Sequence, residues 1–478
     1  MNGPLTLLPR LQLLPLLFGG WLAAASAWAQ APEDLLSDYI QVASESGAEG
    51  TAGRFLADYC RERGLAVEVF DDLDSAYNFT ASLYPLSSGR PNIVLLHHID
   101  VVPAHADGWT HPPYAGRIAD GAVWGRGAID AKGLGVMHLA ALLHYREEAR
   151  RRPLPYNVTM LAVSGEETGG LNGSARIVEH HPATLNAAVV FGEGGSGVYD
   201  AIPSRPEVPV FGVSVAEKTS LWLRLDLQMR ASGHGAAPPP QYANRSMLRA
   251  LYKLQSQKTK FVFTDVSKQM FRHFGELEGG VKGYVLKRFH WRAFRPIVRN
   301  YVEEQPLLRA LVSNTYTVTN ITNPPGPINQ IPSLVTTYLD CRLLPGTTRK
   351  KFLRELRRGL FEPRFDVTVL DESPAAPPTE PDAFYDAFAE AIKEVYPDGA
   401  VLPILFPATT DNNYYRAAGV PTYGLVPIVM SEATIASIHG TDEHLNIQAL
   451  HRGVDVFKRL LARFLGPTAE MSIEVELR

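Results

Sequence analysis

Three apolar runs separated by helical segments constrain the fold of this chain more than any other feature of its sequence. The runs are NIVLLHH at residues 92–98, NVTMLAVSG at 157–165 and AAVVFGEGG at 187–195, and residues 133–148 have the apolar spacing of a helix. Continuous apolar runs that alternate with helices are typical of parallel strands buried on both faces. The sequence therefore predicts an α/β fold in which helices cover both faces of a mostly parallel sheet.

The strand pattern changes around residue 221 and changes back after residue 374. Between these points apolar residues alternate with polar ones in SLWLRLDLQM, TYTVTNIT and LVTTYLDCRLL, which is the pattern of half-buried strands. A chain of 478 residues also exceeds the roughly 250–300 residues at which one hydrophobic core stops growing. We therefore expect a first domain built from residues 30–218 and 372–466, an inserted two-layer α+β domain at 219–371 with a helical insertion at about 250–310, and a tail at 467–478.

The N-terminal segment has the organisation of a secretory signal peptide. Arg10 precedes an uncharged stretch at residues 11–32, and the small-residue site AWA ends at Ala29. The uncharged stretch is long enough to span a membrane, but the proline and glycine residues within it and the AWA site favour cleavage over a retained anchor. We expect residues 1–29 to be removed before Gln30 and the mature protein to be periplasmic or extracellular.

The distribution of charge excludes one class of partner and singles out one segment. The net charge of −4 provides no basic field for nucleic acid, so a small substrate is expected. Residues 279–301 nevertheless contain six lysine and arginine residues and no acidic residue, with Phe289, Trp291 and Phe294 among them. This segment is either a solvated helical insertion or a basic amphipathic surface that contacts lipid or a greasy substrate.

Metal-ligating side chains gather where the predicted strands end. His98 and Asp100 follow the first run, Glu166 and Glu167 the second, and Glu193 lies in the third. Ligands of open α/β sheets collect beyond the carboxyl ends of the strands, so these side chains should converge on one edge. Two further stretches, GRGAIDAKG and SIHGTDEH, add Asp130 and His439. Each residue alone has an ordinary structural explanation, such as a helix cap for Asp130, but the set indicates a metal site.

Five motifs in order carry a resemblance to a known family. HHIDVVP, GRGAIDAKG, SGEETGG, GEGG and HGTDE resemble the co-catalytic zinc peptidase family of aminoacylase, carboxypeptidase S, carboxypeptidase G and succinyl-diaminopimelate desuccinylase. The resemblance covers about residues 34–465, and the long basic insertion is most similar to the carboxypeptidase S and N-acyl-amino-acid hydrolase branch. It implies a zinc-peptidase-like catalytic domain, gives the inserted domain a lid or dimerisation role, and allows a homodimer.

The resemblance also implies a role for each residue of the site. Two Zn²⁺ ions, with Co²⁺ or Mn²⁺ as substitutes, would share Asp130 as a bridging carboxylate. His98 and Glu193 would complete one metal, and Glu167 and His439 the other. Glu166 would be the general base. Asp100, two residues beyond His98 in an extended strand, would accept the second imidazole N–H and fix the metal-binding tautomer.

Substrate contacts are implied for the inserted domain. GPINQIP and TTYLDCRLLPG nominate Asn329 and Arg342 as substrate ligands, with the guanidinium binding a free carboxylate. SGHGAAPPP nominates His234 as the group that reaches the developing oxyanion, in cis or in trans. PATTDNNYY departs from the glycine-rich form of the family, and we expect no role for it beyond shaping the pocket wall.

These observations together predict a secreted di-zinc metallohydrolase. It would cleave the amide bond before a C-terminal amino acid, in a peptide or in an N-acyl amino acid. The alternative is a non-catalytic secreted binding protein with the same fold, which would be expected to lack a ligand or the base. All five ligand positions and Glu166 are present in this chain.

Overall fold

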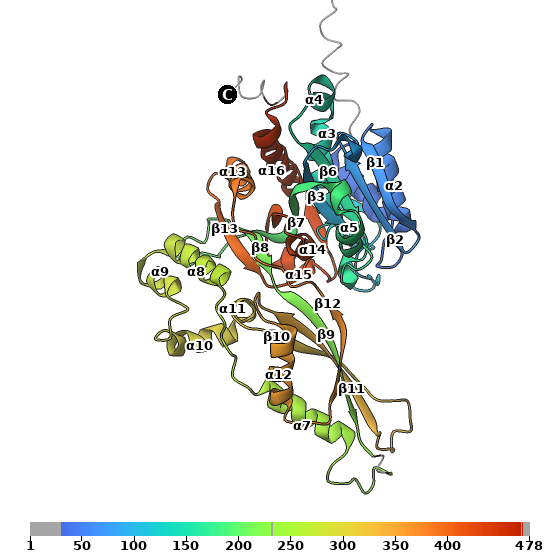
Figure 1. Cartoon of the computed structure of the whole chain (residues 1–478), viewed down its shortest axis with the longest axis vertical. Coiled ribbons are helices and arrows are strands. Elements are labelled where there is room, and N and C mark those ends of the chain that lie inside the picture. The colour runs from blue at the N-terminus through green and yellow to red at the C-terminus, as the bar shows by residue number, and fades with distance from the viewer. Residues whose placement is uncertain (1–29, 231–232, 470, 472–478) are drawn as a thin grey trace, which may run out of the picture.

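The computed structural model describes residues 30–230, 233–469 and 471, and shows a large α/β domain beside a smaller one (Figure 1). The expected signal peptide at residues 1–29 lies outside the described residues, as do residues 470 and 472–478 of the expected tail. Among the residues described, no helix combines the length and the hydropathy that crossing a membrane requires.

An eight-stranded, mainly parallel sheet forms the centre of the large domain. Its order is β1-β2-β6-β3-β7-β14-β8-β13, and the neighbours β6–β3, β3–β7, β7–β14 and β8–β13 are parallel. The strands are β1 (Ala66–Leu73), β2 (Ala76–Ser82), β3 (Asn92–His98), β6 (Asn157–Val163), β7 (Ala187–Val198), β8 (Val210–Glu217), β13 (Ala400–Phe406) and β14 (Thr422–Met430).

Helices cover both faces of this sheet. Successive side chains of a strand point to opposite faces, so an apolar strand contributes to a core on each side. In β3, Ile93 and Leu95 pack into one core and Val94 and Leu96 into another. The first core includes α1 (Pro32–Gln41), α2 (Gly50–Glu62), α3 (Lys132–His144), α13 (Ala383–Val395) and α16 (Ile447–Leu465), and the second includes α5 (Ser174–His180), α6 (Pro182–Leu185) and α14 (Asn412–Ala417). The predicted α/β fold is confirmed.

The smaller domain is a four-stranded antiparallel sheet with two helices on one face. The sheet order is β10-β11-β9-β12, and alternate leucines of β9 pack against both helices. The elements are β9 (Thr219–Gln228), β10 (Thr315–Thr322), β11 (Leu334–Leu343), β12 (Asp366–Glu372), α7 (Ala243–Gln255) and α12 (Arg349–Leu360). The chain passes from β8 of the large sheet to β9 of the small one through the single residue Lys218.

A helical insertion joins α7 to β10 and lies against the edge of the large sheet (Figure 1). It contains α8 (Asp265–Glu278), α9 (Gly280–Lys287), α10 (Arg295–Glu304) and α11 (Pro306–Leu311). Phe274 and Leu277 of α8 pack against Ile202 and Leu402, which places α8 beside β13. The insertion therefore covers a sheet edge that would otherwise be open.

Short elements complete the described chain. A three-stranded sheet has the order β15-β5-β4 and connects the segment before α3 to the segment before α16. The remaining elements are β4 (Arg117–Ala119), β5 (Ala122–Trp124), β15 (His444–Asn446), α4 (Arg146–Arg151), α15 (Glu432–Ser437) and the 3₁₀ turns η1 (Leu86–Ser88) and η2 (Glu166–Thr168).

Candidate active site

The two adjacent glutamates lie in a tight turn directly after β6. Glu166 and Glu167 begin the 3₁₀ turn η2 between Gly165 and Gly169, whose φ angles of +74° and +102° favour glycine. The carboxylate of Asp100 accepts the backbone N–H groups of Glu166 and Glu167, each at 3.1 Å. The end of β3 therefore fixes the turn that presents both glutamates.

The carboxylate of Asp130 lies between two imidazoles. Its Oδ1 is 3.0 Å from His98 Nε2, and its Oδ2 is 3.1 Å from His439 Nε2. Glu193 Oε2 lies 3.7 Å from the same nitrogen of His98, and Glu167 Oε1 lies 3.1 Å from that of His439. The structure thus brings the five predicted ligand residues together, with one carboxylate between two pairs.

The donor set fits metal ions. Ligand atoms of His98, Asp130 and Glu167 lie within 4.8 Å of one another, as do those of His98, Glu166 and Glu193. Glu166 therefore lies within reach of the same volume as the predicted ligands. Imidazole nitrogens and carboxylate oxygens are the ligand types that divalent transition metals bind.

The pKa shifts in the cluster also indicate a site for cations. Burial and the charge of Asp130 raise the pKa of Glu193 to about 7. Burial and the charge of Glu193 raise the pKa of Glu166 well above its usual value. Burial opposes protonation of His98, but the surrounding carboxylates outweigh it and raise the pKa of its imidazole. Negative charge is in excess at this site, and bound cations would neutralise it.

The partner of His98 differs in detail from the sequence prediction. Its Nδ1 lies 2.8 Å from the backbone carbonyl oxygen of Asp100, whereas the Asp100 carboxylate is 3.5 Å away. The side chain of Asp100 is occupied by the Glu166–Glu167 turn instead. Donation from Nδ1 to a carbonyl still leaves Nε2 as the nitrogen that faces Asp130.

Glu443 is a site residue that sequence reasoning missed. Its buried carboxylate accepts the backbone N–H groups of Gly127, Ile129 and Asp130 at 3.0, 2.9 and 3.2 Å, and pairs with Arg126 at 2.7 Å. It thereby holds the loop that presents Asp130. The sequence feature that could have identified Glu443 is its position in the HGTDE motif, four residues after His439.

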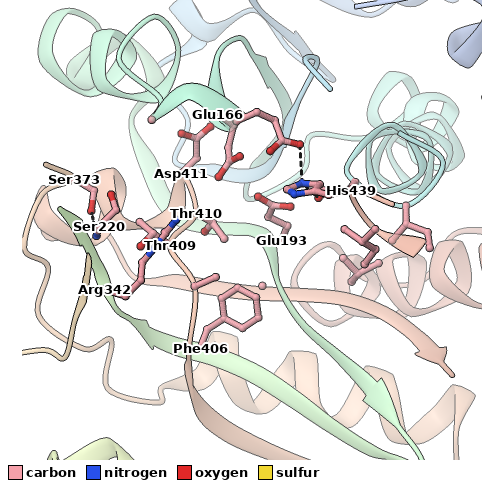
Figure 2. A pocket seen from close by; sticks show the side chains of 18 of the residues that line it. Glu166, Glu193, Ser220, Arg342, Ser373, Phe406, Thr409, Thr410, Asp411 and His439 are labelled. Atoms are coloured by element: carbon pink, nitrogen blue, oxygen red, sulfur yellow. Dashed lines mark hydrogen bonds and ion pairs between the residues drawn. The ribbon is translucent and has the colours of Figure 1, made fainter. Parts of the chain in front are cut away.

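A cavity of about 370 Å³ opens beside the cluster, between the two domains. Figure 2 shows Glu166, Glu193 and His439 at one side and Arg342 with Ser220 at another. Asp340 holds Nε and Nη2 of Arg342 at 2.9 and 3.2 Å. The apolar part of the wall contains Trp222, Phe406, Val426, Met430 and Ile438.

The unusual PATTDNNYY segment also lines this cavity. Asp411 lies beside Glu166 (Figure 2) and is buried, and burial raises the pKa of its carboxyl. The Glu217 carboxylate accepts both the backbone N–H and the hydroxyl of Thr410, which fixes the start of the segment. A pocket wall was expected here, and Asp411 adds a buried acid to it.

His234 and Asn329 are not brought to the cavity. They lie 3.0 Å from each other and are exposed, and neither is among the described residues that line it. Arg342 pairs with Ser220 at the inner end of the small sheet, whereas His234 and Asn329 lie just beyond its outer end, where Leu334 pairs with Gln228. Arg342 lies eight residues along β11 from Leu334, about 27 Å at the roughly 3.4 Å rise of an antiparallel strand.

The fold and the site together define a metal-dependent hydrolase. Comparison with known families matches residues 94–463 to Peptidase family M20/M25/M40, and the chain belongs to this family. It is a metallohydrolase that acts on amide bonds, and not the non-catalytic binding protein that the sequence left open.

Relatives and solved structures agree with this assignment. The N-fatty-acyl-amino acid synthase/hydrolase PM20D1 of Mus musculus is 27% identical over 77% of this chain and 73% of its own length. Aminoacylase-1A of Rattus norvegicus is 26% identical over 86% and 90%. An M20 family metallo-carboxypeptidase from Sulfolobus solfataricus superimposes with a TM-score of 0.67 at 17% identity, covering 92% of this chain and 100% of that one.

A further structural neighbour is described as a dinuclear metal-binding peptidase. It is the YXEP protein of Bacillus subtilis, with a TM-score of 0.54 and 13% identity, covering 91% of this chain and 98% of that one. At this identity the likeness concerns the fold.

Proposed function

We propose that this chain is a secreted amidohydrolase that uses two zinc ions to release a C-terminal amino acid from N-acyl amino acids. The observation that carries the proposal is the position of Asp130, whose two carboxylate oxygens each face a different imidazole, with Glu166 beside them. Secretion is supported by the sequence of residues 1–29.

Asp130 would hold both ions, together with His98 and Glu193 on one side and Glu167 and His439 on the other. Mixed nitrogen and oxygen ligands without thiolate support zinc. Bound there, the ions would polarise the scissile carbonyl and lower the pKa of the attacking water.

Glu166 would take a proton from that water and deliver it to the nitrogen of the leaving amine. Its carboxylate lies within reach of the ligand atoms, and its backbone is fixed through Asp100. The pKa of the half-buried Glu166 carboxyl is raised by desolvation and by the charge of Glu193, which eases formation of the protonated form that a general base passes through.

The cavity supports an amphiphilic acid as substrate. Arg342 offers a guanidinium whose Nη1 is not engaged by Asp340, and guanidinium groups bind carboxylates through paired N–H bonds. Phe406, Val426 and Met430 supply an apolar wall for an acyl group. Relatives named for N-fatty-acyl amino acids and for aminoacylase activity fit this choice over dipeptides.

A substrate panel tests this proposal. The metal-loaded protein should hydrolyse N-acyl amino acids with kcat/KM rising with acyl chain length, and faster than it hydrolyses dipeptides. Replacing the free carboxylate of the best substrate by a carboxamide should lower kcat/KM by about 10- to 100-fold, because a charge-assisted hydrogen bond contributes about 1.5–3 kcal/mol.

The control for Arg342 is a second arginine held in the same way. Arg224 of β9 pairs with Asp226 at 2.9 Å, two residues along the strand, and does not line the cavity. Arg342→Met should abolish the preference for acid over amide, and Arg224→Met should keep it. Equal rates on acid and amide with the wild-type protein would exclude carboxylate binding by Arg342.

We also propose that His234 acts in a homodimer, on the cavity of the partner subunit. His234 and Asn329 are hydrogen-bonded to each other and are exposed beyond the end of β11 that lies about 27 Å from Arg342. A second copy related by a twofold axis could present this pair to the other cavity, where the His234 imidazole would stabilise the oxyanion.

Mixing two inactive variants tests this arrangement. His234→Ala and Glu166→Gln should each lower kcat by about 10²-fold or more. Unfolded together and refolded as a mixture, they should recover about a quarter of the wild-type rate, because half of the random dimers contain one intact cavity. No recovery in a mixture that sedimentation shows to be dimeric would exclude action in trans.

A further inference from the structure

The helical insertion carries a surface that the proposed reaction does not use. Its base is fixed to the protein: Phe289 is only 3% exposed, and its ring centroid lies 4.7 Å from that of Phe271 and 5.8 Å from that of Phe263. Phe289 is therefore a core residue, contrary to its predicted place on a surface. Other residues of α9 and of the loop after it face outward, while Val285 and Leu286 pack against the core with Phe289.

These residues form what we call the basic aromatic patch. Three apolar side chains are unusually open, with Val281 exposed by 81%, Tyr284 by 50% and Trp291 by 49%. The Arg288 guanidinium lies 3.7 Å from the Tyr284 ring centroid and 5.2 Å from that of Trp291. The patch consists of these residues with two further exposed cations: Val281, Lys282, Tyr284, Arg288, Trp291 and Arg292.

Most of the charge of the patch is not balanced locally. Residues 279–302 carry six basic residues and no acid, so the rest of a chain with net charge −4 carries −10. The ion pairs described in the insertion, Lys260 with Glu355, Lys268 with Asp265 and Arg299 with Glu303, do not include the cations of the patch. One acid, Glu278, borders the patch: it accepts the backbone N–H of Ser204 at 3.0 Å, and its carboxylate interacts with the charge of Lys282.

Cations and open apolar side chains together select one kind of partner. A soluble polyanion would neutralise the arginines but leave Val281 and Trp291 in water. A phospholipid surface satisfies both, because aromatic rings sit at the level of the headgroups while arginine and lysine reach the phosphates. We propose that the basic aromatic patch docks this protein on membranes rich in anionic phospholipid.

Helix α12 provides a control for binding through positive charge alone. Helix α12 also exposes a row of cations: Lys350, Lys351, Arg354, Arg357 and Arg358. No exposed apolar side chain lies among these five cations, and the exposed Phe361 follows only at the C-terminal end of the helix. Binding through charge alone would use both helices, whereas docking through the patch depends on α9 and the loop after it.

Vesicle sedimentation tests the proposal. Residues 30–478 should be used, so that the apolar N-terminal segment cannot itself bind lipid. The protein should bind vesicles of phosphatidylglycerol and phosphatidylcholine and not vesicles of phosphatidylcholine alone. Arg288→Glu with Arg292→Glu, and separately Trp291→Ala, should each weaken binding at least tenfold. Arg354→Glu with Arg357→Glu, the same change of charge on α12, should weaken it less than twofold.

Three outcomes would overturn docking through the patch. These are no binding of the wild-type protein to anionic vesicles, an equal loss from the two charge reversals, and wild-type affinity in Trp291→Ala. Equally tight binding of heparin, lost in the same variants, would instead make the partner a soluble polyanion. Unchanged unfolding temperatures and unchanged hydrolysis of a soluble substrate would show that the variants are folded.

Discussion

Replacing Glu166 by glutamine should lower kcat by about 10²- to 10⁴-fold, the usual contribution of a general acid–base group, while two metal ions remain bound. Glutamine keeps the shape of the side chain and the backbone N–H that Asp100 accepts, but it cannot take a proton from water. KM should change little, because the substitution does not touch Arg342 or the apolar wall. Steady-state kinetics and elemental analysis of the same preparation measure both effects.

The neighbouring residue supplies the control for this experiment. Glu167→Gln makes the same chemical change one position along the turn, but Glu167 lies 3.1 Å from His439 and belongs to the predicted ligands. It should lose metal as well as activity. If Glu166→Gln also lost metal, Glu166 would be a ligand and the two adjacent glutamates would have the same role.

The layers of the large domain follow from local sequence. In β3, four consecutive apolar residues enter two separate cores. A continuous apolar run between helices indicates such a strand, buried on both faces of an open sheet. The order and direction of the strands do not follow in the same way. β14 is parallel to β7 and antiparallel to β8, and no pattern within one strand identifies its neighbours.

The predicted ligands lie at the ends of strands or beside glycines, and both features can be recognised in the sequence. The residues that hold these ligands in position cannot be recognised in this way, because their contacts join distant parts of the chain. Glu443 accepts the N–H of Asp130 across 313 residues, and Asp100 holds a turn 66 residues away. In the proposed homodimer the position of His234 would have a further cause, since a site completed by a second subunit is not recorded in the contacts of one chain.

Asp130→Ala should remove both metal ions and should be the most damaging single substitution in the site. The two oxygens of Asp130 face His98 and His439 at 3.0 and 3.1 Å. Alanine would take one ligand from each ion and remove the charge that offsets their mutual repulsion. Metal affinity should fall by more than about 100-fold. Because the ions contribute several kcal/mol to catalysis, kcat should fall by at least about 10³-fold.

A second aspartate in the same cavity, Asp411, separates loss of a ligand from general loss of charge. Asp411 lies beside Glu166 but outside the predicted ligands (Figure 2). Asp130→Asn and Asp411→Asn make the same change, so elemental analysis after dialysis should find two ions per chain in the Asp411 variant and fewer than one in the Asp130 variant. Two ions retained in both would remove Asp130 from the bridge. Loss from both would mean that the charge of the whole cavity, and not one shared carboxylate, holds the metals.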